Sequence, residues 1–154
     1  DDERAAGYRS AMTRHGLGGE VAIQACDFSE DGGYAAAATL LEGGRRRRHR
    51  VTALAAVNDL AAVGALSAAA DAGVDLPGGM AVTGYDDTFL AELRQISLTS
   101  VNPDSAGIGE LAARCLLKRN ADPERPAVEQ LVAPRLVARA SSSQPPRLHA
   151  GVDR

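Results

Sequence analysis

Apolar and polar positions in the middle of the chain alternate in blocks that predict a strand, a helix and a second strand. The first block, VTALAAV at 51–57, is almost wholly apolar, which is typical of a strand buried on both faces of a parallel sheet. A helix is expected over 60–72, because Asn58 and Asp59 directly before it are good N-cap residues. The second strand is expected in MAVTGY at 80–85. The pattern therefore predicts a β-α-β unit around which the rest of the chain is arranged.

Each predicted strand of this unit is followed directly by a polar residue. The first is followed by Asn58 and the second by Asp86 and Asp87. Two parallel strands joined by a helix end at the same edge of their sheet, because the connection between them is right-handed. Asn58 and Asp86 are therefore expected side by side at the carboxyl edge, which is where open α/β sheets bind ligands.

The flanking sequence continues the alternation of strands and helices. Further elements are expected, in chain order, as a helix over 4–15, a strand over 21–27, a helix over 33–42 closed by Gly43 and Gly44, a strand over 98–101, a helix beginning at Asp104 and Ser105, and strand-like runs at 128–133 and 135–140. The clearest helical stripe comprises Ile108, Leu111, Ala112, Cys115 and Leu116. The arginine run at 45–50 favours a solvated loop over a phosphate contact. The alternation predicts an α/β fold, with a parallel sheet flanked by helices.

Composition narrows the class of protein. A chain of 154 residues with 45% hydrophobic residues can build one ordinary domain with a real core. The net charge of −3 and the pI near 5.6 argue against a nucleic-acid surface in this segment. No apolar run approaches the ~18 residues of a membrane span, and the acidic start, DDERAAGYRS, is unlike a signal peptide. A cytoplasmic protein without membrane contacts is expected.

Motifs for catalysis and metal binding are absent from the sequence. Cys26 and Cys115 are far apart, and His15, His49 and His149 are scattered, so no metal-ligand spacing is present. The chain has no GxSxG, P-loop or GxGxxG motif. We therefore expect no catalytic residues, no metal and no cofactor, and a protein that is not an enzyme.

Six short motifs stand in order along the chain: Arg4-Ala5-Ala6-Gly7-Tyr8, Asp27-Phe28, Val57-Asn58-Asp59 with LAAVGAL at 60–66, Gly84-Tyr85-Asp86-Asp87, Leu98-Thr99-Ser100-Val101, and LVAPRLVARAS at 131–141. They resemble the motifs R-x-x-G-[FYW], D-[FW], A-N-D-x-x-A-x-G-A-L, G-[FY]-D-D, L-T-T-V and L-x-P-x-L-V-x-R-x-S of the LacI/GalR family of bacterial transcriptional regulators. The resemblance covers roughly residues 3 to 145 and concerns the effector-binding domain of this family.

The resemblance implies a two-lobed fold of the periplasmic-binding-protein type I class, of which this chain is the C-terminal portion. Residues 1–97 would form the C-terminal lobe without its first strand, and residues 98–122 a strand and helix of the N-terminal lobe. Residues 123–142 would return to the C-terminal lobe, and 143–154 would be a disordered tail. A DNA-binding headpiece, a hinge and most of the N-terminal lobe would precede Asp1.

The resemblance also implies a function. A regulator of this family binds a small effector, typically a sugar or sugar derivative, between its lobes, forms a homodimer, and binds operator DNA through its headpiece. The alternative is a sugar-binding protein of an ABC transporter, which shares the fold. That alternative would carry a signal sequence and would lack the closing motif L-x-P-x-L-V-x-R-x-S. A third hypothesis, an enzyme on a doubly wound sheet, lacks a catalytic constellation at the edge of the sheet.

Four residues are the candidate ligand contacts. Asp86 offers a carboxylate that accepts hydrogen bonds from vicinal hydroxyls, with turn capping as the alternative. Asn58 offers a donor and an acceptor, with helix capping as the alternative. By the resemblance, Arg4 contributes a planar guanidinium, or is a solvated residue of a first helical turn. Phe28 contributes a ring that can stack on a sugar face, or is a core aromatic.

Three further positions qualify this assignment. Asp59 is expected to cap a helix, and Asp87 to have a capping or structural function. Pro103 stands where the family usually has Gln, so a polar contact between the lobes is expected to be lost.

By the resemblance, a homodimer contact is expected at four apolar residues, with packing in the core as the alternative: Leu60, Val63, Leu66 and Leu93.

Overall fold

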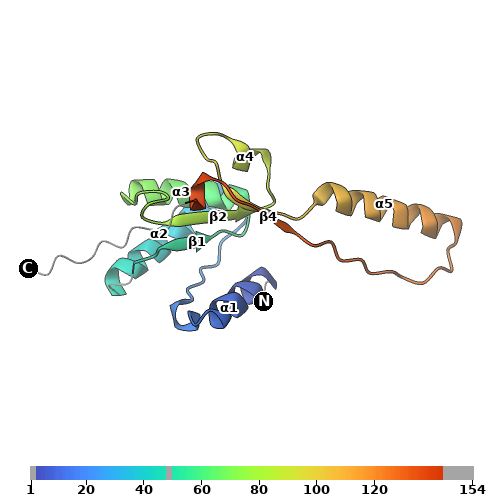
Figure 1. Ribbon diagram of the computed structural model, residues 1–154, viewed down its shortest axis with the longest axis horizontal. Helices are drawn as coiled ribbons and strands as arrows, with labels where there is room; N and C mark the ends of the chain where they lie inside the picture. Colours follow the sequence, from blue (N-terminus) through green and yellow to red (C-terminus); the bar gives the residue numbers. More distant parts are fainter. Residues whose placement is uncertain (1–2, 48–49, 144–154) are drawn as a thin grey trace, which may run out of the picture.

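The computed structural model describes residues 3–47 and 50–143 and has a mixed α/β architecture (Figure 1). Its elements, in chain order, are α1 (Glu3–Arg14), the 3₁₀ turn η1 (Gly18–Glu20), α2 (Glu30–Arg47), β1 (Ala53–Ala55), α3 (Asp59–Asp71), β2 (Ala81–Tyr85), α4 (Phe89–Glu92), β3 (Thr99–Asn102), α5 (Ser105–Ala121), β4 (Arg135–Val137) and the 3₁₀ turn η2 (Ala140–Ser142).

Four strands form one sheet in the order β1-β2-β3-β4. Strands β1 and β2 are parallel, with Leu54 opposite Val82, and β2 and β3 are parallel, with Thr83 opposite Thr99. Strand β4 is antiparallel to β3. The predicted β1-α3-β2 unit is therefore present, and the α/β class is confirmed, with one antiparallel strand at the edge of an otherwise parallel sheet.

Helices α2 and α3 pack against each other through glycines. A Cβ atom on Gly64 would lie 2.0 Å from the backbone oxygen of Glu30, and one on Gly33 would lie 2.2 Å from that of Ala61. The two helix backbones approach too closely for any side chain at these positions. Alanines on α3 complete the contact, so the Ala- and Gly-rich composition of this part of the chain determines how closely its helices pack.

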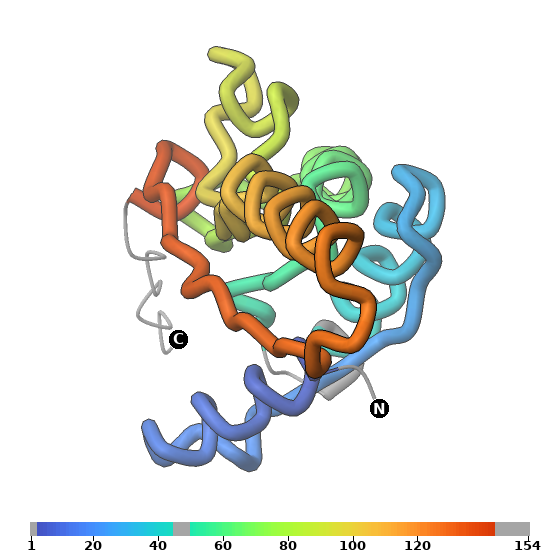
Figure 2. Tube along the Cα trace, turned by 90° about the vertical axis from the view of Figure 1, so that its right-hand side faces the viewer, coloured from blue at the N-terminus to red at the C-terminus, as the bar shows by residue number. Residues whose placement is uncertain are grey.

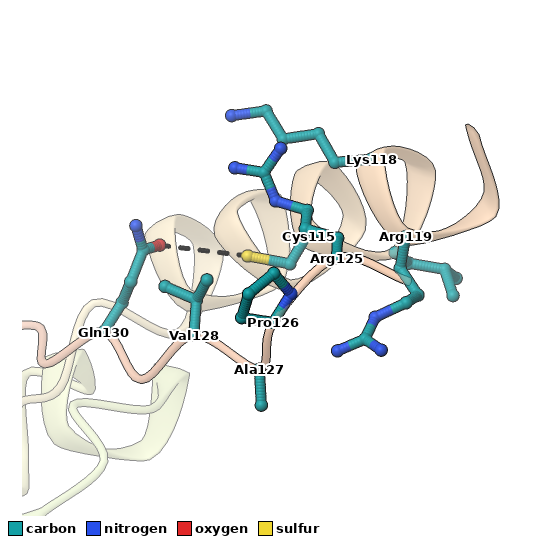
Figure 3. Close-up of a pocket in the computed structure, with 9 residues that line it drawn as sticks. Cys115, Lys118, Arg119, Arg125, Pro126, Ala127, Val128 and Gln130 are labelled. Atoms are coloured by element: carbon teal, nitrogen blue, oxygen red, sulfur yellow. Dashed lines mark hydrogen bonds between the residues drawn. The ribbon is translucent and has the colours of Figure 1, made fainter. Parts of the chain in front are cut away.

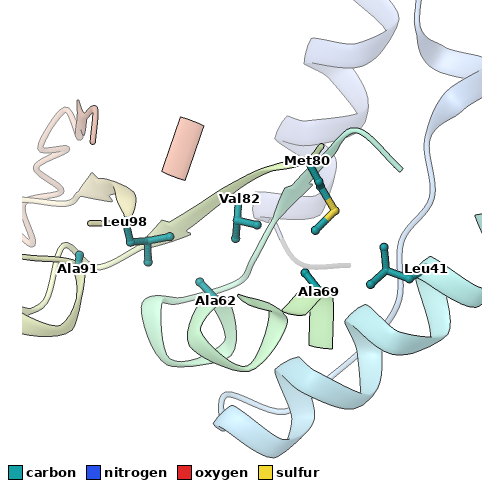
Figure 4. Close-up of a cluster of buried hydrophobic side chains, with 7 residues drawn as sticks. All are labelled: Leu41, Ala62, Ala69, Met80, Val82, Ala91 and Leu98. Atoms are coloured by element: carbon teal, nitrogen blue, oxygen red, sulfur yellow. The ribbon is translucent and has the colours of Figure 1, made fainter. Parts of the chain in front are cut away.

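The hydrophobic core lies between α3 and one face of β2 (Figure 4). Its buried members are Leu41, Ala62, Ala69, Met80, Val82, Ala91 and Leu98. Burial of apolar side chains of this size contributes about 25 cal/mol for each Å² removed from water. This core attaches α2 and α3 to the sheet and so determines where the start of α3 lies relative to the end of β2.

Strand β1 is less buried than its sequence predicts. Ala53 and Ala55 are exposed and Leu54 is half-buried. The expectation of a strand covered on both faces is wrong in this structure, because β1 lies at the edge of the described sheet and Leu54 packs against the clusters formed by α2, α3 and β2 on one face only.

The segment before the core also differs from expectation. Residues 21–27 have no strand structure and are mostly exposed, because they form no ladder with β1 and a strand requires a pairing partner. Helix α2 continues through Gly43 and Gly44 to Arg47, so these glycines do not end it. A glycine in a helix interior costs only about 1 kcal/mol relative to alanine, which the packing of α2 on α3 offsets. Arg45–Arg47 are therefore helical, whereas residues 48–49 lie outside the described residues.

Helix α5 stands apart from the sheet (Figure 1) and projects toward the viewer in the turned view of Figure 2. It contains no buried residue, and its stripe residues Ile108 and Leu116 are exposed. Strand β3 pairs with β2, whereas the helix that follows it in the chain, α5, has no place in the sheet. The run at 128–133 forms no strand, and β4 begins only after Pro134. Of the tail expected at 143–154, residues 144–154 lie outside the described residues.

Helix α1 forms where the amphipathic pattern predicts it. None of its residues is buried, and Tyr8, Ala11 and Met12 are partly covered. None of the helices in the described ranges, 3–47 and 50–143, combines the length and apolar character that a membrane span requires.

Candidate ligand site

Asn58 lies between β1 and α3 and bonds to two separate segments. Its Oδ1 accepts a hydrogen bond from the backbone N–H of Ala61 at 2.8 Å, which makes it the N-cap of α3. Its Nδ2 donates to the backbone oxygen of Phe28 at 3.2 Å. The capping considered for Asn58 is therefore observed, and the same side chain holds the segment that carries Phe28 beside the end of β1.

Arg4, in the first turn of α1, reaches the same edge of the sheet. Its Nη1 donates to the backbone oxygen of Val57 at 2.8 Å. Its guanidinium carbon lies 4.9 Å from the centre of the Tyr85 ring and 5.7 Å from that of Phe28, both within the range of cation–π attraction. The Phe28 ring is exposed, with 58% of the residue surface accessible, so it is not a core aromatic.

Tyr85 was not among the expected site residues. It is the last residue of β2, is half-buried, and lies directly before Asp86. Aromatic residues make up only 3% of this chain. The presence of one at the carboxyl end of a predicted strand could therefore have marked Tyr85 as a candidate site residue.

Asp86 follows β2 and is exposed. Its backbone φ of 100° lies in a region that residues other than glycine rarely adopt. Partial burial and the charge of Asp59 raise the pKa of Asp86, while the positive charge of Arg4 acts in the opposite direction. Asp86, Arg4, Phe28 and Asn58 thus gather at the carboxyl edge, each connected to at least one other through a contact or an electrostatic interaction.

Asp59 does not cap the helix that it begins, contrary to expectation. It is only 1% exposed, and its carboxylate accepts hydrogen bonds from the backbone N–H of Thr88 at 2.6 Å and from the Thr88 hydroxyl at 2.9 Å. Its other oxygen accepts a hydrogen bond from the Ser100 hydroxyl at 2.5 Å. A buried carboxylate requires donors, and the chain supplies them from two distant segments, whereas the neighbouring Asn58 caps α3.

Asp87 is held by an ion pair and by hydrogen bonds. Its Oδ1 lies 2.7 Å from Nη1 of Arg139, and its Oδ2 accepts a hydrogen bond from Asn102 at 2.7 Å. The backbone N–H of Asp87 donates to the Ser100 hydroxyl at 3.1 Å. Burial alone would raise the pKa of Asp87, but hydrogen bonds from Asn102 and Arg139 hold it below its usual value. The structural function expected for Asp87 is therefore observed.

The closing segment of the chain attaches to the sheet through hydroxyl groups. The Ser141 hydroxyl donates to the backbone oxygen of Val82 at 2.6 Å and accepts from the backbone N–H of Thr99 at 2.8 Å. Arg139 also donates to the backbone oxygen of Leu98 at 2.9 Å. The last motif of the sequence therefore anchors the C-terminal segment to β2 and β3.

The four apolar residues expected at a dimer contact differ in exposure. Leu60 and Leu93 are exposed. Val63 is partly buried, and Leu66 packs against the hydrophobic core cluster. Pro103 lies in the connection between β3 and α5.

The described residues contain no group of three or more His, Cys, Asp or Glu side chains that could hold a metal ion.

A shallow hollow of about 330 Å³ lies away from this edge, between α5 and the segment that follows it (Figure 3). Cys115, Lys118 and Arg119 line it from α5, and residues 125–128 and Gln130 line its other side. None of the candidate ligand contacts lines this hollow, so it is separate from the site at the sheet edge.

Comparison with known proteins identifies the family of this chain. The family described as periplasmic binding protein-like domain matches residues 1–142. The chain belongs to this family.

This periplasmic binding protein-like domain is similar to bacterial transcriptional regulators. It is 32% identical over 142 residues to the HTH-type transcriptional regulator MalR of Streptomyces coelicolor, a match that covers 90% of this chain and 40% of MalR. It resembles the crystal structure of a LacI transcriptional regulator from a Rhodococcus species with a TM-score of 0.83 and 33% identity, over 90% of this chain and 50% of that one. It resembles the transcriptional regulator CelR in complex with cellobiose with a TM-score of 0.81 and 32% identity, over 90% and 42% of the two chains.

The LacI/GalR resemblance of the motifs is confirmed by these relatives. The periplasmic binding protein-like domain described here spans about two fifths of the length of MalR and half of the Rhodococcus regulator.

Proposed function

We propose that this chain is the effector-binding and dimerisation portion of a LacI-type DNA-binding transcriptional regulator, and that its effector is a small sugar or sugar derivative. The observation that carries the proposal is the contact of Arg4 with Phe28 and Tyr85 beside Asn58 and Asp86, at the edge where parallel sheets bind ligands. The similarity to CelR, whose structure contains cellobiose, supports a sugar as the effector class.

The chemistry of this edge suits a polyhydroxylated ligand. The exposed ring of Phe28 offers an apolar face for the C–H groups of a sugar. The carboxylate of Asp86 accepts hydrogen bonds from hydroxyl groups, and the guanidinium of Arg4 donates them. Because Asn58 already uses its Oδ1 and one N–H within the protein, its remaining N–H and the second lone pair of Oδ1 are the groups left for a ligand.

We infer that the site is completed by a second lobe. Helix α5 with its exposed apolar stripe, Ile108 and Leu116 among it, belongs in this proposal to the N-terminal lobe, while β3 stays with the C-terminal lobe. A DNA-binding headpiece preceding Asp1 in the complete protein would carry the operator contacts. Pro103 stands where the family usually has Gln. In this proposal, the polar contact that the Gln would make between the lobes is therefore lost.

We further propose a homodimer that uses α3 and the connection after β2. Leu60 and Leu93 are exposed on these elements and are available to a second subunit, together with Val63. Leu66 already packs against the core and contributes less than the other three.

In this proposal, the protein is a cytoplasmic regulator and not an enzyme. The curated relatives are named as HTH-type transcriptional regulators, which favours this function over the ABC-transporter alternative. The closing motif, which the resemblance assigns to regulators, is present, and the hydroxyl of its Ser141 bonds to β2 and β3.

The proposal is tested with the product of the complete open reading frame that contains this chain. A panel of ribose, cellobiose, lactose and maltose is screened by thermal shift, and each hit is measured by titration calorimetry. We expect at least one sugar to bind and Asp86→Ala to weaken its binding by at least tenfold without unfolding the protein. Unchanged affinity in Asp86→Ala, or no binding by any sugar of the panel, would contradict the proposed site or effector class.

A further inference from the structure

Asp59 connects three elements of the ligand edge. It is the first residue of α3, it is 1% exposed, and its carboxylate binds Thr88 at the start of α4 and Ser100 on β3. We propose that Asp59 is a positioning residue for the effector site, which holds the turn at 86–88 so that Asp86 faces the ligand. This inference deepens the proposed function and rests on it.

The turn that carries Asp86 requires such support. Asp86 and Asp87 have φ angles of 100° and 50°, and backbones of this kind persist only where the surroundings hold them. Asp59 holds the end of the turn through both the N–H and the hydroxyl of Thr88. Ser100 donates to Asp59 and accepts from the N–H of Asp87, so one hydroxyl connects the carboxylate to the middle of the turn.

The packing around Asp59 leaves its carboxylate little freedom. A Cβ atom on Gly84 would lie 2.4 Å from Oδ1 of Asp59 and 2.8 Å from a methyl carbon of Leu98. Glycine at this position in β2 therefore makes the room that the carboxylate occupies. Since Gly84 lies two residues before Asp86, the same short stretch of chain both accommodates Asp59 and presents Asp86.

Asp59 also acts on Asp86 through its charge. The negative charge of Asp59 adds to partial burial in raising the pKa of Asp86, and Arg4 on α1 opposes both. Asp87, the other carboxylate of the turn, is paired with Arg139. A neutral residue in place of Asp59 therefore lowers the pKa of Asp86, so the loss of effector binding on acidification shifts to lower pH.

Substitutions at Thr88 separate this effect from general destabilisation. Thr88→Val removes the hydroxyl that donates to Asp59 but keeps the size of the side chain, whereas Thr88→Ser keeps the hydroxyl. In the product of the complete open reading frame, we expect Thr88→Val to weaken binding of the bound panel sugar by at least fivefold and Thr88→Ser to stay within twofold of wild type. Equal affinities in the two variants would overturn the proposal.

Asp59→Asn provides the second test, in two measurements. With the bound sugar, we expect at least tenfold weaker binding, and we expect the loss of binding on acidification to occur at lower pH than in wild type. Wild-type affinity and an unchanged pH profile would overturn the positioning function.

Without any sugar, hydrogen–deuterium exchange of the peptide that contains 86–88 is expected to accelerate, while exchange of α5 stays unchanged. If no panel sugar binds but exchange of 86–88 accelerates, the proposed effector class fails and the hold of Asp59 on the turn stands; unchanged exchange of 86–88 overturns it.

Discussion

Asn58 and Asp59 are adjacent in sequence, carry similar side chains, and bond to entirely different parts of the protein. Asn58 caps α3 and reaches the backbone of Phe28, whereas Asp59 points into the interior toward Thr88 and Ser100. The difference follows from the backbone, because Asn58 is extended (φ −153°, ψ 176°) as the N-cap whereas Asp59 is the first helical residue, so their side chains leave the chain in different directions. The Asn58 side chain therefore lies at the carboxyl edge, and that of Asp59 faces the sheet.

At this scale the two carboxylates of the turn are expected to respond oppositely to pH. The pKa of Asp87 is lowered, so its unfolded state takes up the proton first as the pH falls. Asp87 therefore stabilises the fold above its unfolded pKa of about 3.9, and the stabilisation is lost as the pH falls through its folded value. We expect Asp87→Asn to lower the free energy of unfolding at pH 7 and to flatten its decline below about pH 5, measured by urea unfolding.

Asp86→Asn is the matched comparison for Asp87→Asn. Because the pKa of Asp86 is raised, its charged form is less favourable in the folded state, and its contribution falls as the pH rises. Asp86→Asn is therefore expected to increase the free energy of unfolding at pH 7. A decrease of equal size in both variants would show that the charges of the two residues do not act as described.

Among the elements, α2 and α3 each contain glycines, some at the contact between the two helices and some on a free surface. Gly64 on α3 faces the backbone of Glu30, whereas a Cβ atom on Gly43 of α2 would meet no atom of the described residues within 4 Å. Two glycines that look equivalent in a helical sequence therefore have different functions, since only one of them lies where two backbones meet.

We expect Gly64→Ala and Gly43→Ala to change stability in opposite directions. The added methyl of Gly64→Ala would lie 2.0 Å from the Glu30 oxygen, so α2 and α3 must separate, at a cost of about 1–3 kcal/mol. Gly43→Ala adds a methyl to open space and is expected to stabilise α2 by up to about 1 kcal/mol. Urea unfolding of both variants measures the difference; a neutral Gly64→Ala would mean that the helices are not held at this separation.

At the scale of the whole molecule, the sheet and α5 are differently packed. The sheet has a buried core, whereas α5 extends away from it with its apolar stripe exposed (Figure 1). A helix with an apolar stripe is stabilised mainly by packing that stripe against another surface. The proposed N-terminal lobe would supply that surface in the complete protein.

Leu116 and Leu117 test this arrangement, because both are 69% exposed but only Leu116 belongs to the stripe. In the product of the complete open reading frame, we expect Leu116→Ser to lower the free energy of unfolding by about 2 kcal/mol, as for a buried apolar side chain. Leu117→Ser is expected to stay within about 0.5 kcal/mol of wild type, as for a surface residue. Similar small effects in both variants would contradict a lobe packed on the stripe.

The β1-α3-β2 unit, the capping by Asn58 and the stripe of α5 could be predicted from the order of residues alone. These features depend on the spacing of neighbouring residues, since a helix repeats every 3.6 residues and a buried strand is a short apolar run. The carboxyl edge also followed from the sequence, because the handedness of a β-α-β connection is nearly invariant.

The contacts between polar residues at that edge depend on how distant segments of the chain pack together. Asp59 bonds to residues 29 and 41 positions away, and Tyr85 contacts Arg4 from the far end of the β-α-β unit. The absence of a strand at 21–27 and the exposure of β1 were decided in the same way, since a strand depends on partners that lie elsewhere in the chain. Local patterns determine elements, whereas the pairing of distant segments determines burial, and burial separates the structural carboxylate of Asp59 from the exposed carboxylate of Asp86.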